Sequence, residues 1–185
     1  MVLGNGNGSA LEAALGSQRL GAPENEVVRA VGLGEIAVSR APEEVLVAYG
    51  LGSCVGVVGY DPHEQVGGLL HALLPWQRPG EANPAKFVDS GIPLLVRKME
   101  SLGAKRAAIV WRVVGGAEML GSPAGPAAFR IGAQNVSAAQ TVMQQEGLTI
   151  RASDLGGSVG RTVKLRMRDG AVIVRTLGQG EKVLA

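Results

Sequence analysis

The sequence predicts an α+β fold, a layered α/β sandwich of mixed β-sheets with two main helices packed outside. Short β-branched and aliphatic runs outnumber helical patterns, and several follow one another directly, which does not fit the strand–helix alternation of a doubly wound sheet. Hydrophobic residues make up 46% of the chain and aromatic residues only 3%, so the predicted core is aliphatic. The 28 glycines predict many turns and close backbone approaches.

The pattern divides the chain into two parts. Residues 1–26 are rich in Gly, Ala and Asn, which predicts a flexible N-terminal extension. Residues 27–185 carry the apolar periodicity and are expected to form one domain, because a chain of 185 residues suits a single domain with a short extension.

The first half of this domain contains short apolar runs with strand character. The runs are residues 31–38, 45–49, 54–60 and 66–74. A tight turn at 50–53 separates the second run from the third, and Pro75 stops the fourth. A polar loop rich in proline follows over residues 77–84.

The second half mixes two helices with further strands, so that about seven or eight strands are expected in all. Helical spacing predicts helices over 86–102 and 134–146, and Pro93 either kinks the first or marks its true start. The remaining predicted strands are residues 107–114, 148–152 and a hairpin, 162–168 with 171–177, that turns at Asp169-Gly170.

Bulk properties exclude several classes of function. A net charge of +2 is too weak for a nucleic-acid footprint. One cysteine excludes an internal disulfide and fits a reducing cytosol, and with two scattered histidines it makes no metal-ligand set. No apolar run reaches the roughly 18 residues of a transmembrane helix, and the N-terminus does not read as a secretory signal. We therefore expect a cytoplasmic protein without a metal or organic cofactor.

Cys54 and His71 are the candidates for chemistry. Cys54 follows a glycine-rich turn whose backbone N–H groups could lower the thiol pKa and stabilise an oxyanion, although it could also be a small buried apolar residue. His71 lies in an apolar strand, where an imidazole is either satisfied by the backbone or serves as a general base. His63 follows Asp61-Pro62 and is expected to be an exposed turn residue.

Several segments, taken together and in order, resemble the CheD family. The turn before Cys54 and the His71 segment, which ends at Pro75, carry the most specific part of the resemblance. The matching segments are 32–38, 50–57, 60–62, 67–75, 114–119, 131–136, 154–157 and 160–161. They span the chain from about Val31 to Leu177 and so cover most of it.

The resemblance implies a layered α/β fold with a Cys–His–Thr catalytic set. It implies hydrolysis of glutamine side chains on methyl-accepting chemotaxis receptors to glutamate, with hydrolysis of glutamyl methyl esters as a second activity, and binding to a CheC-type phosphatase. At matching positions, Cys54 is expected to be the nucleophile and His71 the base. The candidate substrate-binding residues are Gly52, Ser53, Gly115 and Gly116.

Position 48 departs from the family pattern. The pattern has threonine six residues before the cysteine, and this chain has Ala48, so the hydroxyl that would hold the imidazole is missing. Tyr49, Ser53 or a backbone carbonyl could orient His71 instead. The departure predicts slow turnover that Ala48→Thr would speed by roughly 10- to 100-fold. It also favours the alternative of a weak or inactive adaptor that binds a CheC-type phosphatase or a receptor; a thiol redox sensor is a third reading.

Overall fold

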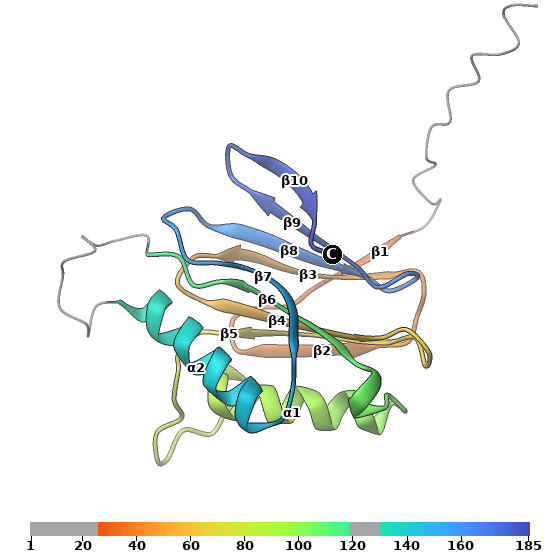
Figure 1. The fold of residues 1–185 in the computed structure, drawn as a ribbon, viewed down its shortest axis with the longest axis horizontal. Coiled ribbons are helices and arrows are strands. Elements are labelled where there is room, and N and C mark those ends of the chain that lie inside the picture. The colour runs from red at the N-terminus through yellow and green to blue at the C-terminus, as the bar shows by residue number, and fades with distance from the viewer. Residues whose placement is uncertain (1–25, 119–129) are drawn as a thin grey trace, which may run out of the picture.

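A computed structural model describes residues 26–118 and 130–185, and these form two five-stranded sheets and two α-helices. Both helices lie on the same side of one sheet, and the second sheet covers its other side (Figure 1). The expected α+β sandwich with two outer helices is confirmed. The predicted extension over residues 1–26 falls almost wholly outside the described residues, and the first strand begins at Val27.

The outer sheet contains the C-terminal hairpin. Its strand order is β1 (Val27–Ala30), β3 (Glu44–Leu51), β8 (Arg161–Arg166), β9 (Ala171–Thr176) and β10 (Gly180–Val183). β1 pairs with β3 in parallel, and the other pairs are antiparallel. Along β8, Val163 and Leu165 are buried and alternate with more exposed neighbours, as the hairpin pattern predicted.

The central sheet is covered on both faces. Its strand order is β2 (Glu35–Ser39), β5 (Val66–Ala72), β4 (Val55–Asp61), β6 (Val110–Gly115) and β7 (Ile150–Leu155), with only β6 and β7 parallel. Every residue of β4 and β5 is buried. Double coverage explains why both strands read as continuous apolar runs rather than as alternating ones.

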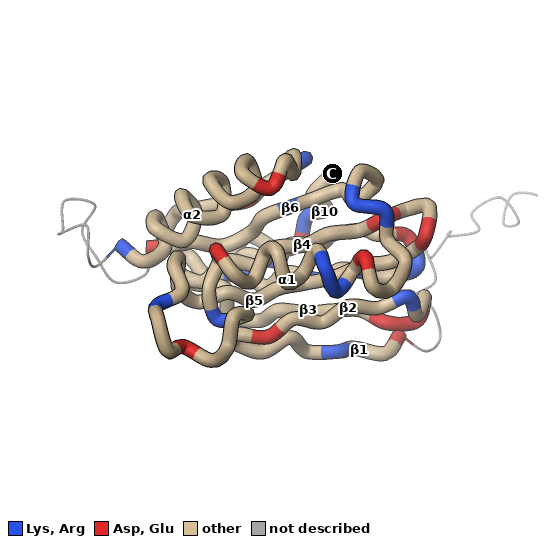
Figure 2. The backbone as a smooth tube through the Cα atoms, turned by 90° about the horizontal axis from the view of Figure 1, so that it is seen from below, with Lys and Arg blue, Asp and Glu red and all other residues tan. Residues whose placement is uncertain are grey.

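The helices α1 (Val88–Ser101) and α2 (Ile131–Gln145) complete the third layer, and Figure 2 shows both in front of the central sheet when it is viewed from below. Two cores result. One lies between the central sheet and the helices, and the other lies between the two sheets. Leu70 belongs to the helix-side core and Leu69 to the inter-sheet core, as strand alternation requires.

Several element boundaries differ from the sequence predictions. The described residues contain ten strands, more than the seven or eight predicted. The strands β1 and β10 were not predicted, because they are short, exposed and carry no burial pattern that a sequence could show. The run 31–38 divides into a turn and β2, and residues 106–108 form a 3-10 turn before β6. α2 begins at Ile131, one turn earlier than predicted. Pro93 lies inside α1 and does not start it.

The chain passes from the outer to the central sheet at residues 52–54, between β3 and β4. The predicted tight turn at 50–53 is in part a β-bulge: the register with β8 shifts between Ala48 and Leu51, and Gly50 adopts a φ of +65°. Because of the bulge, Ala48 and Leu51 both face the inter-sheet core, and strand alternation does not continue to Gly50. Cys54 thus sits at the crossing between the sheets.

Candidate active site

The loop that carries Cys54 is held by main-chain hydrogen bonds from the segment after β6. The Gly116 N–H donates to the Cys54 carbonyl over 2.7 Å, and the Ala117 N–H donates to the Gly52 carbonyl over 2.7 Å. The same segment is joined to the end of β7, because the Gly156 N–H donates to the Gly115 carbonyl over 2.9 Å. Three segments far apart in the sequence therefore fix the backbone around the thiol.

Glycine is required where this segment passes the loop. Gly115 has a φ of +112° and Gly116 a φ of +70°, a region that L side chains rarely adopt. A Cβ at position 115 would collide with the Cys54 carbonyl, and one at position 116 would collide with Val136 of α2. The glycine pair read from the sequence is explained by this close approach.

Asn135 ties the Cys54 loop to the strand of His71. Its side-chain amide donates to the carbonyls of Ser53 and Leu73, each over 2.8 Å, and the residue is fully buried. Its Oδ1 has no hydrogen-bond partner among the described residues. Asn135 was not identified as a site residue from the sequence, although it lies four and seven residues before the buried Ala139 and Val142.

His71 and Cys54 face the same space between the sheets. His71 lies opposite Gly56 on β4, and a side chain at position 56 would point at Leu51 and Val163 of the outer sheet. Cys54, two residues before Gly56, packs against the inter-sheet core. Residues directly opposite in an antiparallel pair share a face, and so do residues two apart in a strand. The fold therefore brings the two candidates onto one face.

The His71 ring has one hydrogen bond. Its Nδ1 lies 3.2 Å from the Val31 carbonyl oxygen, whereas Nε2 is buried and has no hydrogen-bond partner among the described side chains, the Cys54 thiol included. Burial lowers the pKa of His71 below its ordinary value, and the Val31 hydrogen bond and the charge of Glu35 only partly oppose this. The imidazole is therefore neutral at pH 7, as a general base requires.

The expectation of a lowered thiol pKa is wrong for the substrate-free protein. Burial raises the pKa of the half-buried Cys54 thiol, and its own backbone N–H opposes that rise without overcoming it. Among the turn donors that suggested a thiolate, the Gly52 N–H is committed to the Gly50 carbonyl over 2.8 Å. In the resting site both the thiol and the imidazole are neutral.

Alkylation of Cys54 in the free protein should therefore be slower at neutral pH than that of an unperturbed thiol, and it should keep rising above about pH 8.5. Iodoacetamide labelling followed by mass spectrometry measures this directly, because the chain has one cysteine. The same chain unfolded in urea is the matched control and should show the ordinary thiol profile. A rate that levels off below pH 7 would instead reveal a thiolate–imidazolium pair.

The other predicted residues lie at or near this loop. Gly52 and Ser53 belong to the loop itself, and Gly115 and Gly116 form the segment that holds it. Tyr49 is 56% exposed and points away from the inter-sheet core, which removes it as a partner of His71. His63 is exposed, as expected for a turn residue.

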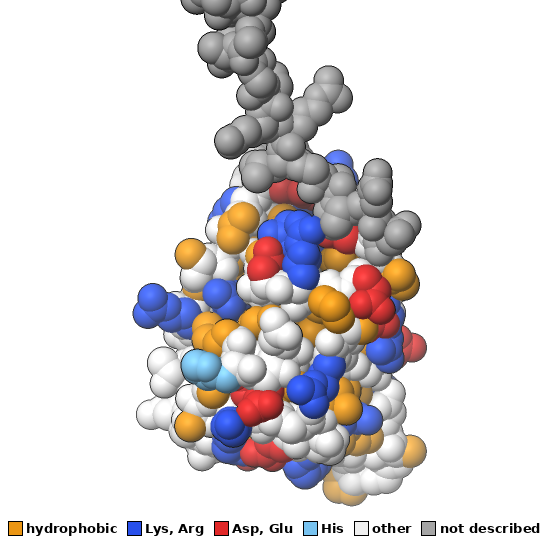
Figure 3. All heavy atoms as spheres, turned by 90° about the vertical axis from the view of Figure 1, so that its right-hand side faces the viewer, with side chains coloured by type: hydrophobic (Ala, Val, Ile, Leu, Met, Phe, Trp, Pro, Cys, Tyr) orange, Lys and Arg blue, Asp and Glu red, His pale blue; other side chains and the backbone are white. Residues whose placement is uncertain are grey.

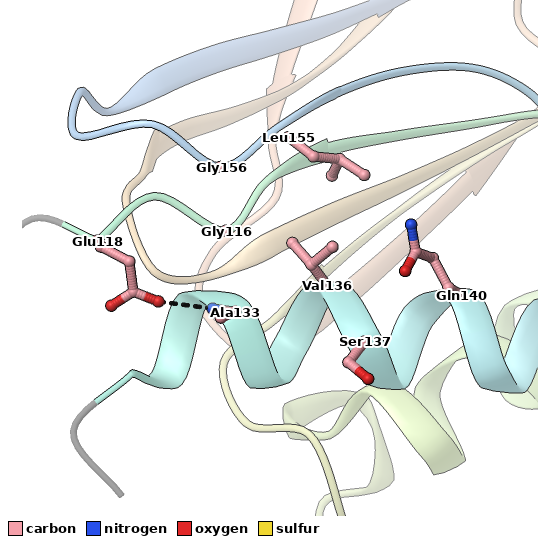
Figure 4. A pocket seen from close by; sticks show the side chains of 8 residues that line it. All are labelled: Gly116, Glu118, Ala133, Val136, Ser137, Gln140, Leu155 and Gly156. Atoms are coloured by element: carbon pink, nitrogen blue, oxygen red, sulfur yellow. Dashed lines mark hydrogen bonds between the residues drawn. The ribbon is translucent and has the colours of Figure 1, made fainter. Parts of the chain in front are cut away.

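A pocket of about 320 Å³ lies beside the Gly116 segment, between α2 and the end of β7 (Figure 4). It is lined by Gly116, Glu118, Ala133, Val136, Ser137, Gln140, Leu155 and Gly156. The Glu118 carboxylate accepts the Ala133 N–H over 2.7 Å and so satisfies a free donor in the first turn of α2. Neither Cys54 nor His71 lines this pocket.

Replacing Asn135 with a charged residue should show how much the stability of the Cys54 loop depends on its side-chain amide. In Asn135→Asp, a buried carboxylate would face two carbonyl oxygens without a donor, so the free energy of unfolding should fall by about 3 kcal/mol at pH 7. The folded-state pKa of such a carboxyl lies above its unfolded value, so the penalty should shrink as the pH falls toward the unfolded pKa. Urea unfolding at several pH values measures this.

Asn135→Ala is the matched control for that series. It removes the same two hydrogen bonds and adds no charge, so its loss of stability should not depend on pH across the same range. Equal pH dependence in the two variants would contradict the assigned role of the amide.

Comparison with known proteins gives a consistent result. The family model described as CheD chemotactic sensory transduction matches residues 73–176, a span that begins just after His71. A probable chemoreceptor glutamine deamidase CheD of Symbiobacterium thermophilum is 39% identical over 160 residues, covering 85% of this chain and 97% of that protein. The chemoreceptor glutamine deamidase CheD of Halalkalibacterium halodurans is 39% identical over 161 residues, covering 85% and 98%.

Solved structures add little to this. Neisseria meningitidis protein NMB0706 aligns with a TM-score of 0.38 and 9% identity over 66% of this chain and 52% of its own, which is too distant to support a functional conclusion. The family model covers more than half of this chain, and the two relatives align over nearly their full lengths. The chain therefore belongs to the CheD family.

Proposed function

We propose that this protein is a chemoreceptor glutamine deamidase in which Cys54 is the nucleophile and His71 the base. The observation that carries the proposal is the common face of these two side chains at the crossing between the sheets. The names of its relatives supply the substrate class: glutamine side chains of chemoreceptors, which deamidation converts to glutamate.

Acylation comes first. Neutral His71 takes the Cys54 proton on Nε2 as the sulfur attacks the amide carbon of the substrate glutamine, which forms a tetrahedral oxyanion. The backbone N–H groups of Ser53 and Cys54 are the donors we assign to this oxyanion. The imidazolium then protonates the amide nitrogen, the C–N bond breaks, and ammonia departs. A glutamyl thioester remains on Cys54.

Hydrolysis completes the cycle. His71, neutral again, takes a proton from water as the water oxygen attacks the thioester carbon. The C–S bond breaks, the proton returns to sulfur, and glutamate is released. Since the pKa of His71 is lowered, kcat/KM should fall only when the pH drops below the ordinary histidine range.

Substrate binding is assigned to the backbone of Gly52, Ser53, Gly115 and Gly116. In this proposal the loop residues contact the reacting amide, and the receptor main chain lies against the backbone of the glycine pair. The pocket beside Gly116 supports this assignment, because it opens next to the segment that holds the nucleophile.

The test is mass spectrometry of a receptor cytoplasmic fragment after incubation with the protein. Conversion of selected glutamines to glutamate, with release of ammonia, is the expected result. A receptor fragment recovered with unchanged glutamines, under conditions in which an established family member converts them, would contradict the proposal.

The second candidate is a weak or inactive adaptor that binds a CheC-type phosphatase or a receptor, and Ala48 is the observation that favours it. A cytoplasmic location is part of both proposed functions.

Within residues 26–118 and 130–185, no helix is long and apolar enough to cross a bilayer. On the face seen in Figure 3, acidic and basic side chains are interspersed, which suits a protein partner better than a nucleic acid.

A further inference from the structure

We infer that the turn between β1 and β2 positions His71, and that the Val31 carbonyl takes the orienting role which the family pattern gives to threonine and which Ala48 cannot fill. The inference rests on the proposed function, because it concerns the base of that reaction. Val31 is a positioning residue in this scheme and does not touch the substrate.

The hydrogen bond at Nδ1 fixes the tautomer of the ring. A carbonyl oxygen can only accept, so the 3.2 Å contact with Val31 requires the proton to be on Nδ1. In the neutral imidazole, the lone pair is then on Nε2, the atom with no other partner in the described part of the chain. A base that takes a proton from Cys54 needs this tautomer.

The Val31 carbonyl is itself held in place from both sheets. The Val31 N–H donates to the Val47 carbonyl over 2.8 Å and so continues the pairing of β1 with β3 in the outer sheet. Three residues later, the Gly34 N–H donates to the carbonyl of His71 over 2.8 Å in the central sheet. The turn therefore holds both the backbone and the ring of the same histidine.

Glu35 closes the turn. Its carboxylate accepts the Gly32 N–H over 2.8 Å, and it lies directly opposite His71 in the pairing of β2 with β5. The side chain is exposed, so solvent screens its charge and its hydrogen bond is the stronger contribution to the turn.

Ala48 occupies the inter-sheet core with no exposed surface. A threonine there would bring a buried hydroxyl that needs a partner, and the Nδ1 proton is already donated to Val31. Ala48→Thr should therefore not give the 10- to 100-fold gain in rate that the family pattern suggests. We expect its kcat to stay within about threefold of wild type.

The first test needs no substrate. Long-range 1H–15N correlation spectra of the whole protein, recorded above the histidine pKa, report which ring nitrogen carries the proton. His63→Gln removes the only other histidine, so one pattern remains to be assigned. A protonated Nδ1 is expected. Protonation at Nε2 would overturn the inference, whatever the protein does to receptors.

The second test uses Glu35 in the receptor assay. Glu35→Ala removes the bond to Gly32 and should lower kcat roughly 10-fold with little change in KM, since orientation matters in the transition state. Glu35→Gln retains an acceptor and should remain within about twofold of wild type. Equal rates for all three proteins, or a 10-fold gain on Ala48→Thr, would overturn the positioning role. A wild type that converts no receptor glutamine would overturn the proposed function instead, while the spectra still report the tautomer.

Discussion

Cys54→Ala is expected to abolish conversion of receptor glutamines, with a fall in kcat of about 10⁶-fold, the scale found when a nucleophile that acts with its base is removed. No second thiol can replace it, because the chain has one cysteine. The measurement is the deamidated fraction of a receptor fragment over time.

The fold of this variant should be preserved. The loop is held through the carbonyls of Gly52, Ser53 and Cys54, and alanine keeps all three, so the free energy of unfolding should change by less than about 1 kcal/mol. Affinity for a CheC-type protein should also be unchanged if that protein docks away from the thiol. Residual deamidation equal to wild type would exclude Cys54 as nucleophile, whereas loss of partner binding would tie docking to the active site.

Gly115→Ala should damage both stability and activity. The position has a φ of +112°, and its added Cβ would run into the Cys54 carbonyl, a main-chain atom that cannot move without shifting the loop. We expect a loss of roughly 2–3 kcal/mol in unfolding free energy from the strained backbone. A fall in kcat of about 100-fold should accompany it, because a small displacement of a reacting group has that effect.

Gly147→Ala is the matched control. Gly147 also has a positive φ, +66°, but a Cβ there would meet nothing within 4 Å, and it lies after α2. Its cost should be about 1 kcal/mol, from the left-handed backbone alone, with kcat unchanged. If both alanine variants retained wild-type kcat, the close approach at position 115 would have no part in placing the nucleophile.

Much of the layered fold could be predicted from local patterns. Helical spacing located α1, and the alternation in the C-terminal hairpin predicted which side chains of β8 face inward. The short edge strands β1 and β10 could not be found, since they are exposed throughout and so carry no pattern of buried and exposed residues.

The two candidate residues of the site could be identified from the sequence, whereas the groups that hold them in place could not. Cys54 and His71 stand out by residue type and context, and the structure places them on one face. Asn135 and the Val31 carbonyl act through tertiary contacts across 82 and 40 residues, and no sequence periodicity reports such pairs. The thiol pKa was predicted wrongly for the same reason, because burial by other layers outweighs the donors of the local turn.

The contacts that hold the Cys54 loop also determine when the active site can assemble during synthesis of the chain. Cys54 leaves the ribosome early, but Ala117, Asn135 and β8, which pairs with the preceding strand β3, follow much later. Strand pairing over such separations is slow, and the pairing of β3 with β8 cannot be complete before Arg166 has been made. A nascent or truncated chain that ends before β8 therefore carries the thiol without its scaffold, and we expect such a chain to be inactive toward glutamine.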